Sequence, residues 1–155
     1  MDVEESIQKT ITHSTEGTQR LGEKFVKGLK DGTLVALNGE IGAGKTVFVR
    51  GMAKALNIKE NVVSPTFTLM REYTGDKKLY HFDVYRMHDA DELKETGFQD
   101  YIGGDGITVV EWAEMVEAEL PRDRVTVHMK RTDEPDRREI VIRYPKNKDL
   151  EAVDG

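Results

Sequence analysis

Residues 39–46 read GEIGAGKT and match the spacing G-x-x-x-x-G-K-[ST] at every fixed position. Glycine tolerates positive φ and has no Cβ, so successive backbone N–H groups are free to converge on phosphate oxygens. Lys45 would reach the outer phosphates, and the Thr46 hydroxyl would ligate Mg²⁺. A turn that only reverses the chain does not require Lys45 and Thr46 directly after the last glycine. The stretch therefore predicts a phosphate-binding loop for a nucleoside triphosphate and Mg²⁺.

The nucleotide is expected to contact this loop and the first turn of the helix after it. We expect its contacts to come from Glu40, Ile41, Gly42, Ala43, Gly44, Lys45, Thr46 and Val47. Guanine is read in GTPases through Asn-Lys-x-Asp, and the segment NKDL at 147–150 places its acid one residue too early. The sequence therefore favours adenine, and the expected cofactors are ATP and Mg²⁺.

Two apolar stretches end in an acid: LYHFD ends at Asp83, and ITVVE ends at Glu111. P-loop proteins place the Mg²⁺ ligand and the water-orienting group at the carboxyl ends of strands. Each acid also fits an ordinary use, Asp83 as a turn cap and Glu111 as a first-turn acid of the next helix. Beside a phosphate loop, both are candidates for the metal site.

Other candidates lie close to these acids. Thr66 lies in the segment SPT at 64–66. It would complete the coordination shell of the metal only when the γ-phosphate is present, as in a switch loop. The alternative is that SPT forms an ordinary turn. Trp112 is by default a core or interface aromatic, and His81 a structural histidine in a strand.

The elements that would position these residues follow from periodicity and turn signals. Helices are expected at 15–30 with Thr15 as N-cap, at 45–56, around 90–95 and through WAEMVEAEL. Strands are expected at 33–38, in a hairpin of TFTLMREY and KLYHFDVYR, at ITVVE, and at RVTVHMK and REIVIRY. We predict an α/β, P-loop NTPase-like three-layer fold with a mixed central β-sheet. We expect one domain over residues 1–155, with polar, frayed tails at 1–9 and 145–155.

Composition excludes several other functions. The chain has 155 residues, a net charge of −6 and no cysteine, so thiolate nucleophiles and sulfur-based zinc sites are absent. The negative charge argues against extended contact with a nucleic-acid backbone. The acidic N-terminus and the lack of a long apolar run predict a soluble, unprocessed protein without membrane contact.

Together these motifs resemble one family closely, the TsaE (YjeE) P-loop ATPases. The resemblance is carried by LNGEIGAGKTVFVRG, SPTFTLMREY, LYHFDVYR and VVEWAE, in that order, supported by EGTQRLG, and covers roughly residues 15–131. It implies a bacterial cytoplasmic ATPase that takes part in making threonylcarbamoyladenosine (t6A) in tRNA. It also implies TsaB and TsaD as partners, whose complex this protein would bind and turn over.

The resemblance assigns roles to single residues. It makes Lys45 and Thr46 the phosphate and Mg²⁺ residues, Thr66 the switch threonine and Asp83 a Mg²⁺ ligand. Glu111 becomes the acid needed for hydrolysis, at the metal site, and Trp112 lies beside the nucleotide. Adenine contacts are expected within residues 13–18, Thr18 included.

Alternatives remain open. A small-molecule kinase would share the loop and the Mg²⁺ acid, but the chain offers no arginine-rich lid. A nucleotide-gated binding module with little hydrolysis would use the same residues as an ATPase. Of the arginines near the motifs, Arg50, Arg71 and Arg86, none lies on an evident mobile loop aimed at the phosphates. We therefore expect hydrolysis that is weak alone and stimulated by the partners.

Overall fold

The protein is described by a computed structural model at residues 6–65, 70–85, 87 and 90–145. Its strands are β1 (Ser6–Thr12), β2 (Leu34–Gly39), β3 (Met70–Thr74), β4 (Lys78–Asp83), β5 (Ile107–Glu111), β6 (Val125–Arg131) and β7 (Arg138–Tyr144). Its α-helices are α1 (Thr15–Lys27), α2 (Lys45–Ala55) and α3 (Ala90–Glu95), and its 3₁₀ segments are η1 (Phe98–Tyr101) and η2 (Ala113–Glu119). Among these helices, none combines the length and apolar composition needed to cross a bilayer.

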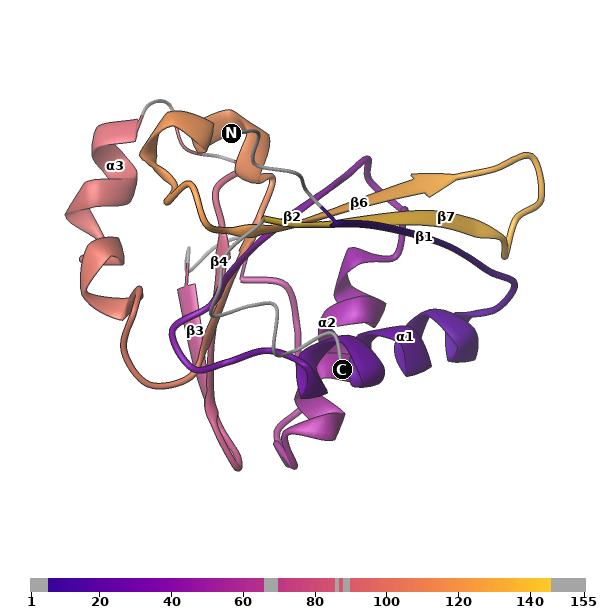
Figure 1. Ribbon diagram of the computed structural model, residues 1–155, viewed down its shortest axis with the longest axis horizontal. Helices are drawn as coiled ribbons and strands as arrows, with labels where there is room; N and C mark the ends of the chain where they lie inside the picture. Colours follow the sequence, from indigo (N-terminus) through magenta and orange to yellow (C-terminus); the bar gives the residue numbers. More distant parts are fainter. Residues whose placement is uncertain (1–5, 66–69, 86, 88–89, 146–155) are drawn as a thin grey trace.

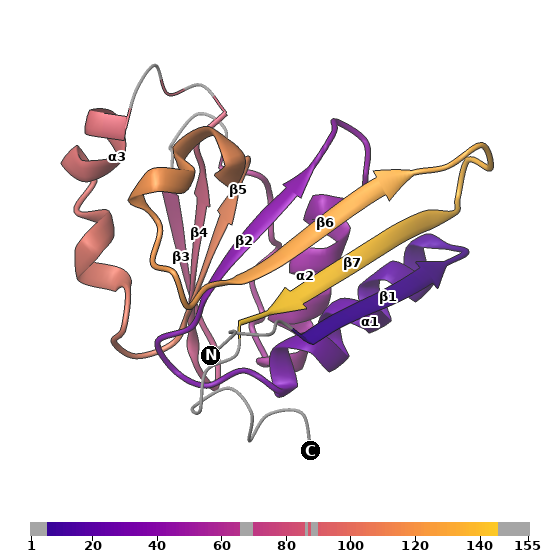
Figure 2. The same ribbon diagram turned by 45° about the horizontal axis from the view of Figure 1, so that its top comes forward.

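The strands form one mixed sheet of seven strands in the order β1-β7-β6-β2-β5-β4-β3 (Figure 2). The central strands β4, β5, β2 and β6 are parallel, while β3, β7 and β1 pair antiparallel with their neighbours. Parallel strands end at the same edge of a sheet. The carboxyl ends of β2, β4 and β5 therefore meet at one edge, where ligands bind in open α/β sheets.

Helices cover both faces of the sheet, which confirms the predicted three-layer α/β fold (Figure 1). The side chains of β2 alternate between the two layers: Val35 and Leu37 join the core under α1 and α2, whereas Leu34 and Ala36 join the core under α3, η1 and η2. All four side chains are at most 2% exposed. A strand buried on both faces reads as a continuous apolar run, as residues 33–38 predicted.

Two glycines let α1 and α2 pack backbone to backbone. A Cβ built on Gly22 would lie 2.2 Å from the carbonyl oxygen of Phe48, and one built on Gly51 would lie 2.0 Å from that of Gln19. Real side-chain atoms do not approach this closely, so neither position accepts a larger residue without separation of the helices. Because α2 begins at the phosphate loop, this packing fixes the helix that carries Lys45 and Thr46.

Gly51→Ala is expected to destabilise the protein by about 1–2 kcal/mol. Alanine gains about 1 kcal/mol in helix propensity over glycine, but overpacking costs about 1–3 kcal/mol and more in tight sites. Urea denaturation followed by circular dichroism measures the difference. Gly104→Ala is the matched control, because no heavy atom lies within 4 Å of its added Cβ. Equal midpoints for both variants would contradict the close-packing account.

The N-terminal prediction was wrong in two details. Residues 6–9, expected in a frayed tail, belong to β1, which pairs with β7 along its whole length. The burial pattern explains why this strand was not predicted. The side chains from Ser6 to Lys9 are all exposed on this edge strand, so they show no apolar pattern typical of a core. The N-cap of α1 is Ser14 rather than Thr15, since the Ser14 hydroxyl accepts a 2.9 Å hydrogen bond from the Gly17 amide.

The helix expected through WAEMVEAEL is instead the 3₁₀ segment η2, interrupted at Val116 where φ is −130°. Trp112 precedes it with φ of 62°, in the left-handed region that residues other than glycine rarely adopt. The side-chain oxygen of Asn38 accepts a 3.1 Å hydrogen bond from the Glu114 amide. This bond ties the first turn of η2 to the end of β2, beside the phosphate loop.

Candidate functional site

The phosphate loop joins β2 to α2, and its backbone has the conformation that the glycine pattern requires. Gly42 and Gly44 have φ of 83° and 99°, in the left-handed region that favours glycine. Gly44 is also the N-cap of α2 and makes no side-chain cap. The N-terminus of α2 therefore has no side-chain cap, which leaves its N–H groups available to an anion.

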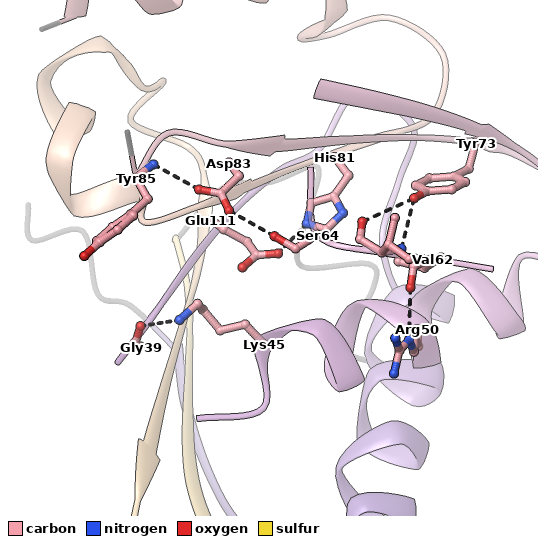
Figure 3. A network of polar contacts seen from close by, with 11 residues as sticks. Gly39, Lys45, Arg50, Val62, Ser64, Tyr73, His81, Asp83, Tyr85 and Glu111 are labelled. Carbon is pink, nitrogen blue, oxygen red and sulfur yellow. Dashed lines mark hydrogen bonds and ion pairs between the residues drawn. The ribbon is translucent and has the colours of Figure 1, made fainter. Parts of the chain in front are cut away.

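Lys45 is the first residue of α2, and its side chain folds back over the loop (Figure 3). Its Nζ donates to the carbonyl oxygens of Gly39 and Glu40, at 3.1 Å for Glu40. Only 7% of the residue is exposed. Burial lowers the pKa of Lys45 from its ordinary value, while the carboxylates of Glu111, Glu114, Asp83 and Glu40 oppose that shift. The acids thus favour the charged ammonium in a partly desolvated place.

Asp83 and Glu111 are neighbours across the β4–β5 ladder, where they pair in register. Both are nearly buried, with 4% and 3% exposed. Asp83 accepts hydrogen bonds from the Ser64 hydroxyl at 3.1 Å and from the Tyr85 amide at 2.9 Å (Figure 3). Glu111 contacts the ring of the fully buried His81 at 2.5 Å. The two carboxylates are held in place by different partners.

An open cleft of about 530 Å³ collects most of the predicted residues. It is lined by Ile41, Gly42, Gly44, Lys45, Thr46, Val47, Ser64, Asp83, Tyr85, Glu111, Trp112 and Arg138. Of the remaining loop residues, Glu40 is exposed, and Ala43 lies buried behind the loop. Thr66, the expected switch threonine, lies outside the described residues. Its neighbour Ser64 reaches the cleft and contacts Asp83.

Trp112 lines the cleft, and its partly buried side chain also packs against the core under α3, η1 and η2. Lys45 Nζ is 4.2 Å from the centroid of its ring, a cation–π contact. The Trp112 ring also lies 4.6 Å, between centroids, from that of Tyr85, which is 45% exposed. Trp112 directly follows β5 and has a left-handed backbone conformation.

Thr18 lies beside a smaller pocket of about 50 Å³ that adjoins the cleft. This pocket is lined by Ser14, Thr15, Thr18, Gly44, Val47, Asp136 and Arg138. Gly44, Val47 and Arg138 line both spaces. Thr18 itself is 2% exposed, and its hydroxyl lies 2.7 Å from that of Thr12. The segment expected to contact adenine is therefore next to the loop, although the Thr18 hydroxyl already has a partner.

An arginine that donates hydrogen bonds to the loop is one that the sequence did not single out. Arg138, at the start of β7, donates to the carbonyl oxygens of Ala43 at 3.1 Å and Gly42 at 3.0 Å. Arg50 donates instead to Val62 at 3.0 Å, Arg71 lies exposed on β3, and Arg86 is outside the described residues. No local motif signals Arg138, because it approaches the loop only through the pairing of β6 with β7.

The donor set fits a Mg²⁺ that is shared with phosphates. Among the described residues, no group of three or more histidines and acids gathers around one point, so the chain offers no complete metal cage there. The cleft does combine the Thr46 hydroxyl with the Asp83 and Glu111 carboxylates. Mg²⁺ commonly takes one or two carboxylates together with substrate phosphates and water. These residues suit that mode of binding.

Comparison with known proteins agrees with the fold and the motifs. Residues 12–140 match the family model "Threonylcarbamoyl adenosine biosynthesis protein TsaE". The tRNA threonylcarbamoyladenosine biosynthesis protein TsaE of Bacillus subtilis is 41% identical over 86% of this chain and 84% of its own length. That of Treponema pallidum is 40% identical over 79% of this chain and 90% of its own.

A solved structure extends the similarity to three dimensions. The crystal structure of YdiB from Bacillus subtilis superimposes with a TM-score of 0.76 at 33% identity, covering 99% of this chain and 93% of that one. The family model spans the phosphate loop, both strand-end acids and the first residues of β7. From this match and these relatives, we conclude that the chain belongs to the TsaE family, the threonylcarbamoyl adenosine biosynthesis proteins.

Proposed function

We propose that this protein is a Mg²⁺-dependent ATPase that supports t6A modification of tRNA. The proposal depends above all on one observation: Lys45, Asp83 and Glu111, which are far apart in the sequence, line one cleft at the N-terminus of α2. A lysine on the loop and two acids at neighbouring strand ends are the parts that P-loop enzymes use for phosphoryl transfer to water. The role in t6A modification is inferred from membership of the TsaE family.

Each residue has a separate task in this proposal. Mg·ATP, when bound, supplies the polarised γ-phosphate. The loop amides and Lys45 bind and orient the phosphates, as the dipole at the start of α2 favours. Thr46 and Asp83 would hold the metal ion, with Asp83 oriented by Ser64 and the Tyr85 amide. Glu111, positioned by His81, would orient the attacking water and sit at the edge of the metal site.

The isolated protein is expected to hydrolyse ATP slowly. Hydrolysis needs the charge on the γ-phosphate neutralised in the transition state, which P-loop enzymes achieve with a delivered arginine. Arg50 already donates to Val62, and Arg138 to the loop carbonyls. We therefore propose that a complex of TsaB and TsaD completes or orders the site through the segment that begins at Ser64, and that this protein turns the complex over.

Phosphate release measured for the protein alone, and with TsaB and TsaD, tests this function. We expect a slow basal rate that rises with the partners and requires Mg²⁺. Candidate small-molecule acceptors are included, because a phosphorylated acceptor without free phosphate would identify a kinase instead. Nucleotide binding with no phosphate release under any condition would favour a nucleotide-gated binding module. A fast basal rate that the partners leave unchanged would contradict partner stimulation.

Trp112 provides an independent readout of nucleotide binding. We expect its fluorescence to change as Mg·ATP is added, because its ring contacts Lys45 and lines the cleft. As the only tryptophan of the chain, it gives an unambiguous signal. Lys45→Ala is the control and is expected to give no saturable change with nucleotide. A flat titration of the wild-type protein at millimolar Mg·ATP would contradict the placement of nucleotide beside this ring.

A further inference from the structure

Arg138 joins two loops that are far apart in the sequence. Besides Gly42 and Ala43 of the phosphate loop, its guanidinium donates to Pro135 at 2.6 Å and Arg137 at 3.0 Å, in the turn between β6 and β7. All four acceptors are backbone carbonyl oxygens. One side chain thus links the shape of the phosphate loop to the shape of the β6–β7 turn.

These bonds determine which way the loop peptides face. In a planar trans peptide, the C=O of one residue and the N–H of the next point in opposite directions. With the Ala43 carbonyl directed at Arg138, the Gly44 N–H must face away from it. With the Gly42 carbonyl also directed there, the Ala43 N–H faces the other way, where it donates to Glu40 at 3.1 Å. Arg138 therefore fixes the orientation of two successive peptide groups, 42–43 and 43–44, which lie between the two glycines at 42 and 44.

Two further loop carbonyls are occupied as well. Lys45 donates to the carbonyl oxygens of Gly39 and Glu40. Four loop carbonyls therefore accept hydrogen bonds from the cationic side chains of Lys45 and Arg138. Glycines at 42 and 44 would otherwise leave these peptides free to rotate, and ordering them at the moment of binding would weaken affinity. A loop already ordered by Lys45 and Arg138 avoids that loss.

We propose that Arg138 is a positioning residue that presets the phosphate loop for nucleotide and couples the β6–β7 turn to nucleotide affinity. The proposal rests on the proposed function, since it assumes that the loop binds ATP. Arg138 acts through the backbone of residues 42–44. A guanidinium is required, because its planar fork reaches the Gly42 and Ala43 oxygens together, whereas an ammonium is a single point charge.

Equilibrium dialysis with radiolabelled ATP and Mg²⁺ tests the proposal on the full chain. Arg138→Ala is expected to raise the Kd about tenfold or more, the size of effect that follows loss of charge-assisted hydrogen bonds. Arg138→Lys is expected to recover little of it. Millimolar guanidinium chloride should restore affinity to Arg138→Ala, while equal sodium chloride should not. Arg143→Ala, an exposed arginine on the same strand, is the matched control and should bind like wild type.

The outcomes separate this inference from the proposed function. Equal affinity of Arg138→Ala and wild type would overturn the positioning role and leave the ATPase proposal standing. A loss that guanidinium does not rescue, together with a melting temperature lowered in the absence of nucleotide, would show a structural role only and also overturn it. A wild-type protein that binds no Mg·ATP would overturn the proposed function, and this inference with it.

Discussion

Lys45→Ala is expected to reduce ATP hydrolysis at least about 100-fold, the scale seen when one charge-stabilising donor is removed from an active site. The ammonium is the loop's own cation, and it lies 4.2 Å from the Trp112 ring inside the cleft. Without it, the outer phosphates lose a direct charge contact, so binding weakens together with hydrolysis. Steady-state phosphate release and equilibrium dialysis with labelled ATP measure the two effects.

The fold should survive this substitution. Burial lowers the pKa of Lys45, so the desolvated ammonium is a cost to the folded state that alanine removes. Circular dichroism and thermal melting check this point. Lys54→Ala is the matched control on the same helix, since its side chain is 66% exposed and lies 3.9 Å from Glu23, a weak surface pair. Unchanged ATPase activity in Lys45→Ala would refute the phosphate-loop proposal.

Glu111→Gln is expected to separate binding from chemistry. Glutamine keeps the size of the side chain but loses the charge needed to orient and activate water, which is worth about 10² to 10⁴ in rate. ATP should still bind, and more tightly if anything, because one negative charge near the phosphates is gone. We expect a fall in kcat of that size with a Kd no higher than in wild type.

The control for this variant is Glu117→Gln on η2. That glutamate pairs with Arg124 at 3.0 Å, but its side chain is 68% exposed, so its loss should leave both kcat and Kd unchanged. The two carboxylates thus differ mainly in their place relative to the cleft. If Glu111→Gln hydrolysed ATP at the wild-type rate, Glu111 would have no role in hydrolysis, and Asp83→Asn would be the next variant to assay.

Elements with a local signal in the sequence were predicted correctly. The order strand, glycine loop, helix was predicted for residues 33–56, because burial on both faces of β2 and the positive φ of Gly42 and Gly44 leave direct marks in residue type. The strand ends at Asp83 and Glu111 were also predicted from their apolar stretches. The prediction was wrong at β1, an edge strand whose first residues are exposed, and at η2, a 3₁₀ segment broken at Val116 where an α-helix was expected.

The sequence by itself determined the glycine loop of residues 39–46 and the start of α2, because these eight contiguous residues specify the backbone there through local sterics and dipoles. Only the tertiary structure decided what surrounds that loop. Asp83 meets Glu111 through the register of β4 with β5, and Arg138 reaches Ala43 across 95 positions of sequence through β7. Such contacts depend on how all the strands pair to bury one common core, and no short window of sequence contains that information.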